Sequence, residues 1–199
     1  MGLAGIPCED GAKASFFDEI YAASGTGRLL LVDDLFTRQV GKQMSVSGAW
    51  LQPVLMIARV EGLMSAPDYA KAITDMIGAG MAFISVDPQT LMAAYALDRE
   101  AGETGAGRRL DLAARSLGGR NADIVSHCRV AIEFLRVLWS GNRREFSKFA
   151  ATSQVLRRLI SERTNDYPAI LNAVDHSIGG SRFSEYLHGW ARGHFLNWP

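Results

Sequence analysis

Residues 28–38 place the strongest constraint on how this chain folds. Within them, residues 29–32 form a short continuous apolar run, which is typical of a strand buried on both faces in a parallel sheet. Asp33 and Asp34 follow the run, and a helical pattern begins directly after them. Because open α/β sheets bind ligands at the carboxyl ends of their strands, the stretch predicts two carboxylates at a ligand-binding edge.

Two interpretations fit this pair of acids. An aspartate at a helix N-cap accepts a hydrogen bond from an unpaired backbone N–H and suits the helix dipole, and one carboxylate is enough for that. Two close carboxylates also repel each other unless a cation lies between them, and a hard divalent metal ion is the natural cation. Asp33 and Asp34 are therefore candidate metal ligands as well as candidate caps.

Asp87 repeats the same arrangement. Residues 81–86 form a second candidate strand, and Asp87 with Pro88 ends it and starts another helix, from residue 89 to about residue 98. Two strands of one parallel sheet would present their acids along the same edge. Asp87 is thus a third candidate metal ligand, and a helix cap ahead of the proline is the alternative.

Composition sets the broad class. The chain has 199 residues, of which 48% are hydrophobic and 21% charged, as expected for a globular protein of one domain or two small ones. No stretch approaches the roughly 20 apolar residues that a membrane span needs, and the first residues lack the layout of a signal peptide. We therefore expect no membrane contact and a cytoplasmic location. Cys8 and Cys128 are too far apart to indicate a thiolate metal site or a disulfide framework.

The glycine-rich segment 102–107 is the one obvious linker. It divides the chain into an α/β portion, residues 1–101, and a helical region, residues 108–199. Charge also changes there: residues 1–100 carry 7 basic and 12 acidic side chains, a net of −5, whereas residues 101–163 carry 12 and 6, a net of +6. Such opposition indicates either mutual attraction of the two halves or a polyanionic partner for the basic one.

The basic residues concentrate on a predicted helix over residues 142–160. Basic side chains on a helix are usually a solvated face, and RNA contact is the alternative. The candidate nucleic-acid-binding residues are Arg143, Arg144, Lys148, Arg157 and Arg158.

Three segments together resemble a known family: the strand and helix start at residues 29–39, the apolar helix at residues 50–58, and residues 83–91. They resemble the late part of the PIN domain, a family of metal-dependent ribonucleases, in bacterial forms that carry an additional helical region. The resemblance covers approximately residues 12–98. It implies an α/β fold with a partial PIN-like parallel sheet and flanking helices, followed by an all-α region.

The resemblance also implies a chemistry. In PIN domains a strand ends in a Thr/Ser-x-Asp unit whose last acid helps to hold Mg²⁺ or Mn²⁺; this chain matches that unit at Asp34 and departs from it at Val32. If the protein is an active RNA endonuclease, Asp34 and Asp33 bind the metal ion, the ion lowers the pKa of an attacking water, and the basic helix holds the RNA backbone.

One departure from the family is larger. A PIN active site also uses an aspartate after the first strand and a carboxylate on an early helix, and both would lie before residue 12. The resemblance therefore implies a nuclease module that is truncated or inactive in this chain. The alternative is a non-catalytic helical interaction module or scaffold that binds a partner protein or a second copy of itself.

Overall fold

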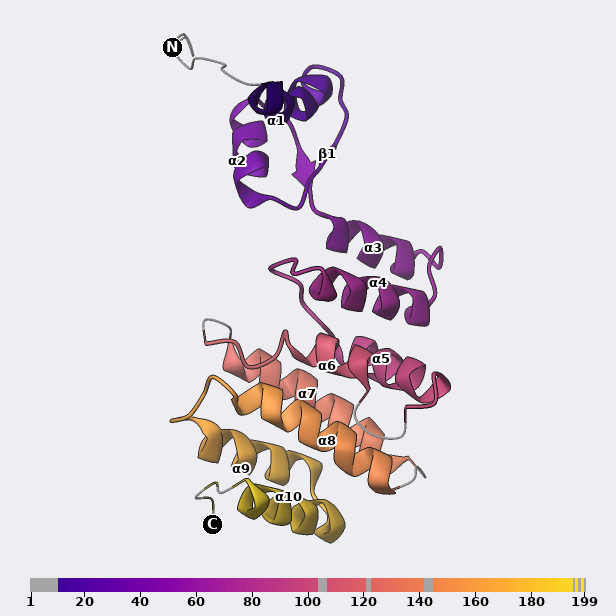
Figure 1. Cartoon of the computed structure of the whole chain (residues 1–199), viewed down its shortest axis with the longest axis vertical. Coiled ribbons are helices and arrows are strands. Elements are labelled where there is room, and N and C mark those ends of the chain that lie inside the picture. The colour runs from indigo at the N-terminus through magenta and orange to yellow at the C-terminus, as the bar shows by residue number, and fades with distance from the viewer. Residues whose placement is uncertain are drawn as a thin grey trace. The chain divides into compact units, whose positions relative to one another are not determined.

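The computed structural model describes residues 11–103, 107–120, 123–141, 145–194, 196 and 198. Within them the chain forms ten helices and two short strands. Contacts between residues divide the chain into a first compact unit that ends at Leu63 and a second that begins at Met64 (Figure 1). None of the described helices combines the length and the apolar character that crossing a bilayer requires.

The first unit is a small β–α–β arrangement with a helix on either side in sequence. Its elements are α1 (Gly11–Ala23), β1 (Leu30–Leu31), α2 (Leu35–Gln43), β2 (Gly48–Ala49) and α3 (Leu51–Val60). The strands run parallel, with Leu30 opposite Gly48 and Leu31 opposite Ala49. A small core gathers Ile20, Leu30 and Val46 from α1, β1 and the loop before β2.

The second unit is entirely helical in its described residues. Its elements are α4 (Ala66–Gly78), α5 (Pro88–Glu100), α6 (Arg108–Ala114), α7 (Ile124–Ser140), α8 (Glu145–Ile160), α9 (Tyr167–Ile178) and α10 (Ser181–Gly193). The helices pack as a stack (Figure 1): α5 contacts α4, α6 and α7, α8 contacts α6 and α7, and α9 contacts α7 and α10. One continuous apolar core, with Phe134, Leu156 and Leu171 fully buried, joins α5 to α10.

The predicted α/β fold class is wrong. The described residues are largely helical, and their only sheet has two strands of two residues each. The apolar run at residues 29–32 does enter a parallel ladder, but only two residues of each strand are paired, and the last hydrogen bond to β2 comes from the Val32 N–H. Short apolar runs do not distinguish a strand from other buried segments, and the sequence pattern alone could not show how far pairing extends.

The second predicted strand, residues 81–86, does not form. Phe83 adopts a left-handed backbone conformation, with φ of 61°, and its side chain is 85% exposed. A strand residue would have a strongly negative φ. The segment is therefore an irregular connection between α4 and α5, and its apolar residues gave a false strand signal.

Helix α3 also differs from expectation. Its apolar residues cover most of the helix circumference, which predicts a buried helix, yet Ile57 is 62% exposed and Val60 is 83% exposed. Gln52 is its only buried residue. The first unit contains too few elements to surround an apolar helix.

Residues 102–107, where we expected a linker, lie within the second unit, and α5 and α6 on either side of them pack together. Residues 104–106 are outside the described residues. The contact between α5 and α6 centres on the carboxylate of Asp98, which is 5% exposed. Its two oxygens accept hydrogen bonds from the backbone N–H groups of Arg109 (3.0 Å) and Leu110 (2.8 Å).

The Asp98 carboxylate on α5 caps the start of α6. The N-cap residue of α6 is Gly107, which has no side chain that could accept these hydrogen bonds. A Cβ atom at Gly107 would overlap the carboxyl group of Asp98, so only glycine lets the two segments approach this closely.

The Gly107→Ala variant tests this arrangement. We expect it to lower the free energy of unfolding by about 2 kcal/mol, because the added methyl must displace the carboxylate or the helix start. Urea unfolding followed by circular dichroism measures the change. Gly119→Ala is the matched control, since a Cβ there meets no atom within 4 Å; equal stability of the two variants would contradict the close approach.

Candidate functional site

Each of the two adjacent acids at the end of β1 caps a different helix. Asp34 is the N-cap of α2, and its Oδ2 accepts hydrogen bonds from the backbone N–H of Thr37 (2.5 Å) and from the Thr37 hydroxyl (2.6 Å). Asp33 accepts through Oδ1 from the backbone N–H of Leu51 at 2.9 Å, in the first turn of α3. The helix starts thus account for both carboxylates.

The electrostatics of Asp34 agree with this role. The hydrogen bond from the Thr37 hydroxyl, and then that from the Thr37 backbone, hold the pKa of Asp34 below its usual value. Arg38 contributes in the same direction. Its guanidinium donates to the main-chain oxygens of Val32 (3.0 Å) and Asp33 (3.3 Å). Hydrogen bonds and charge from the chain itself therefore favour the ionised form of this carboxylate.

Asp87 has the same role in the second unit. It is the N-cap of α5, and its Oδ1 accepts from the backbone N–H of Thr90 at 2.6 Å. Pro88 occupies the first helical position, where its missing N–H has no intrahelical partner to lose. Asp87 belongs to a different compact unit from Asp33 and Asp34.

The predicted Mg²⁺ or Mn²⁺ site rests on three acids whose carboxylates all have protein partners. Among the residues that the structure describes, no group of three or more His, Cys, Asp or Glu side chains is placed to hold a metal ion. Each of the three predicted ligands instead directs an oxygen at a backbone N–H. The metal and the catalytic role of Asp33 and Asp34 stay predictions, and we derive no reaction step from them.

The predicted RNA-binding residues have different surroundings. Arg143 and Arg144 lie outside the described residues. The ammonium group of Lys148 lies 5.9 Å from the centre of the Trp139 ring and donates to the Trp139 carbonyl at 3.5 Å. Lys148 therefore packs along an aromatic surface of its own unit.

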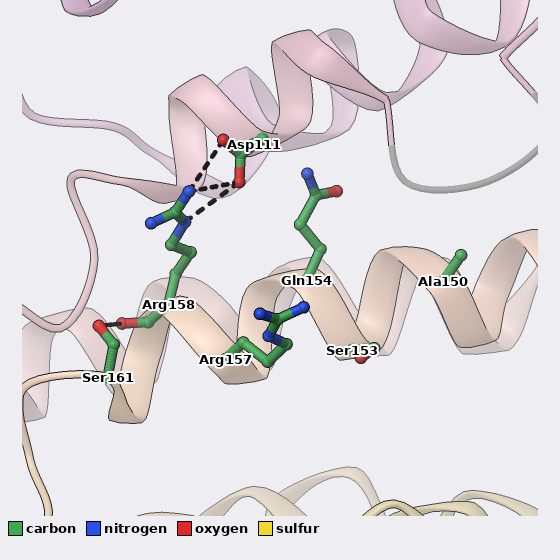
Figure 2. Close-up of a pocket in the computed structure, with 7 residues that line it drawn as sticks. All are labelled: Asp111, Ala150, Ser153, Gln154, Arg157, Arg158 and Ser161. Carbon is green, nitrogen blue, oxygen red and sulfur yellow. Dashed lines mark hydrogen bonds and ion pairs between the residues drawn. The ribbon is translucent and has the colours of Figure 1, made fainter. Parts of the chain in front are cut away.

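Arg158 forms the strongest ion pair at the α6–α8 contact. Its guanidinium binds both carboxylate oxygens of Asp111, at 2.7 and 2.9 Å, as Figure 2 shows. Burial is the largest single influence and would raise the pKa of Asp111, but the hydrogen bond and charge of Arg158, together with Arg115 and Gln154, hold the pKa below its usual value. Pairs in which one guanidinium binds both oxygens of a carboxylate are geometrically specific, so the Arg158 side chain holds α8 against α6.

Arg157, next to it on α8, is exposed and forms no ion pair with a described residue. It lines a cavity of about 410 Å³ between α6 and α8 together with Asp111, Ser153 and Gln154 (Figure 2). Of the five predicted RNA-binding residues, Arg157 alone is described with its charge facing solvent. The cavity wall also carries the acid of Asp111, which opposes the binding of a phosphate.

A larger surface feature lies between α7 and α9. It is a groove of about 700 Å³. The lining residues from α7 are Ile124, Val125, Cys128, Arg129, Ile132, Glu133 and Arg136, and those from α9 and the residue before it are Asp166, Ala169, Ile170, Ala173 and Ser177. Most of the lining is apolar, and Val125 is 73% exposed.

Sequence reasoning missed this groove. The apolar residues of α7 recur at helical spacing, which predicts a buried face, and Ala131, Leu135 and Leu138 do lie in the core. Val125, Cys128 and Ile132 form a second apolar stripe at helical spacing. That stripe was a readable signal, but only the packing of α9 beside α7 turns it into a groove.

The thiol of Cys128 lies in this groove and is free. Burial raises the pKa of the Cys128 thiol above its ordinary value, and the nearby Arg163 only partly offsets that effect. A protonated, half-buried thiol is a poor nucleophile. Cys128 therefore contributes apolar surface to the groove.

Comparisons with known proteins identify no relative: no family model, no curated protein and no solved structure matches this chain.

The capping role of Asp34 can be separated from a metal role by two substitutions. Asparagine caps a helix about as well as aspartate, whereas alanine does not. We expect Asp34→Asn to keep the thermal midpoint of the wild-type protein and Asp34→Ala to lower it, as measured by circular dichroism. A metal ion that binds the folded state would raise the thermal midpoint by mass action. Since Asp34 acts as a cap, we expect millimolar Mg²⁺ or Mn²⁺ to leave the midpoint of every variant unchanged. A shift present in the wild type and absent in Asp34→Asn would restore the metal site.

The two neighbouring arginines of α8 make a second test. Arg158→Ala should lower the free energy of unfolding by about 1 kcal/mol, a figure discounted because both partners are partly exposed. Arg157→Ala removes the same charge one residue earlier and should change stability by less than about 0.5 kcal/mol. Urea unfolding of both variants measures the difference. Equal effects would show that the Arg158–Asp111 pair does not stabilise the α6–α8 contact.

Proposed function

We propose that this chain is a non-catalytic helical interaction module, and that it binds an amphipathic helix of a partner protein in the groove between α7 and α9. The observation that carries the proposal is the groove itself. Large exposed apolar patches on a protein surface mark interaction sites, and a groove between two helices is a common receptor for a third.

The dimensions of the groove favour a helix. The α7 residues that line it run from Ile124 to Arg136. At a rise of about 1.5 Å per residue they span roughly 18 Å, the length of a helical segment of about 12 residues. Across from them, Ala169 and Ala173 are exposed one helical turn apart on α9. Their small side chains let another helix approach α9 closely, and Ile170 beneath them is buried in the core.

Charges at the rim indicate what the partner carries beside its apolar residues. Arg129 and Glu133 lie on the α7 side, and Asp166 lies at the start of α9. Arg136 closes one end, where its guanidinium donates to the carbonyl oxygen of Ser177 at 3.0 and 2.8 Å. A helix with apolar residues at positions i, i+4 and i+7 and charges of both signs beside them complements this surface.

The interaction module is favoured over the ribonuclease because the candidate carboxylates are engaged as helix caps. RNA binding and a cytoplasmic location are sequence-based predictions, and neither is needed for the groove to bind a helix.

Selection from a library of helical peptides of about 16 residues tests the proposal. We expect the selected peptides to share apolar residues at i, i+4 and i+7. Ala173→Arg should weaken their binding at least tenfold, because an arginine side chain fills the groove; isothermal titration calorimetry measures the dissociation constants. Ala66→Arg, at the exposed start of α4, is the matched control and should leave binding unchanged.

Cys128 gives an independent readout in a Cys8→Ser background. A bound peptide should slow the reaction of this thiol with a maleimide reagent, because the thiol lines the groove. Failure to select any peptide with the expected pattern, or selected peptides that bind Ala173→Arg as tightly as the wild type, would overturn the proposal.

A further inference from the structure

Among the residues that the structure describes, the sheet of the first unit is covered on one face and uncovered on the other. Leu30 points into the small core and is 4% exposed, whereas Leu29 and Leu31 on either side of it are 56% and 50% exposed. Parallel sheets are normally covered on both faces, and two strands alone are marginal in water. An apolar strand that is exposed in this way indicates an association surface.

The edge of β1 is also open. The N–H groups of Leu30 and Val32 donate to the carbonyls of Ser47 and Ala49 on the β2 side, both at 2.9 Å. Because alternate residues of a strand direct their main-chain groups to opposite sides, the N–H and C=O of Leu31 point away from β2. No hydrogen bond joins them to any residue in the described part of the chain.

Charges at the two ends of the strand complement each other. Arg28 precedes the apolar run, is exposed and has no ion-pair partner among the described residues. Asp33 and Asp34 follow the run. If a second copy of the strand paired with it in the antiparallel direction, Arg28 of each copy would lie beside the acids that end the strand in the other copy. A parallel copy would set like charges beside each other, which is destabilising.

We propose that two copies of this chain associate through their β1 edges, antiparallel and around a two-fold axis at Leu31. The Leu31 residues of the two copies then form a hydrogen-bonded pair that exchanges both main-chain bonds. Arg28 of each copy lies opposite Asp34 of the other, and Leu30 lies opposite Val32.

This register follows from two requirements. The free main-chain groups of Leu31 must face each other, and the covered face of one sheet must continue into the covered face of the other. Centring the axis on Leu31 meets both requirements and also pairs the charges. The result is an isologous contact that extends the two-stranded sheet to four strands and removes both open β1 edges.

The pairing is short, so the dimer should be weak, with a dissociation constant in the micromolar range. Sedimentation equilibrium of the whole chain over a concentration series measures it. We expect a monomer–dimer equilibrium whose dissociation constant rises with salt, because the Arg28 and Asp34 charges are exposed and therefore screened.

Two pairs of variants test the edge and the charges. Leu31→Lys places two ammonium groups at the axis and should abolish dimerisation, whereas Leu35→Lys, at an equally exposed leucine on α2, should not. Arg28→Asp should weaken the dimer about tenfold. Lys42→Asp makes the same charge change at an exposed residue near the end of α2 and should leave the dimer unchanged.

A cysteine at the axis tests the register. In a Cys8→Ser, Cys128→Ser background, Leu31→Cys should form a disulfide-linked dimer on mild oxidation, because directly paired residues lie about 5.5 Å apart between Cα atoms, within disulfide range. Leu35→Cys should not. A chain that stays monomeric throughout the concentration series, or equal cross-linking at both positions, would overturn the proposal. Peptide binding by the α7–α9 groove is measured separately, so either proposal can fail without the other.

Discussion

The helical unit depends on the carboxylate of Asp98. It is buried on α5, and it satisfies two N–H groups in the first turn of α6 that would otherwise lie unpaired in the interior. A buried donor without a partner costs about 1–3 kcal/mol, so this contact fixes where α6 begins. Helix α6 in turn carries Asp111, which binds Arg158 on α8. Two carboxylates, those of Asp98 and Asp111, thereby link three helices, and Gly107 makes room for the first of them.

Aspartate serves the same purpose at other helix starts. Asp34, Asp87 and Asp123 each accept a hydrogen bond from a backbone N–H in the first turn that follows. An acid that follows an apolar run in the sequence can be either a helix cap or a metal ligand, and the pattern is the same for both. The residue type three positions later cannot separate the two, because every residue except proline carries the N–H that a cap binds. The capping role is visible only in the folded chain, where the backbone N–H groups of Thr37 and Thr90 donate to Asp34 and Asp87.

The sequence predicts a helix correctly where the residues that cap and end that helix lie within or next to it. Helix α4 is an example: Ser65 caps its start, Pro67 and Asp68 lie in its first turn, and it ends at Gly78, all of which are local signals that the sequence displays. The fold class was not predictable in this way. Residues 29–32 and 81–86 carry the same apolar signal, yet only the first enters a ladder, because pairing depends on a partner strand far along the chain. The α7–α9 groove was hidden for a similar reason, since its second wall lies some 40 residues beyond its first.

The exposed apolar residues of the two units call for partners of different kinds. The groove on the helical unit is concave and has a buried floor at Ile170, so it recognises shape and apolar area and needs no main-chain pairing. The β1 edge offers little area, but its free N–H and C=O groups at Leu31 are directional and require another strand. A helix cannot satisfy that edge, and an extended strand cannot fill the groove with regularly spaced side chains. The two surfaces are therefore chemically orthogonal, so the proposed self-association and the proposed helix binding do not compete for the same groups.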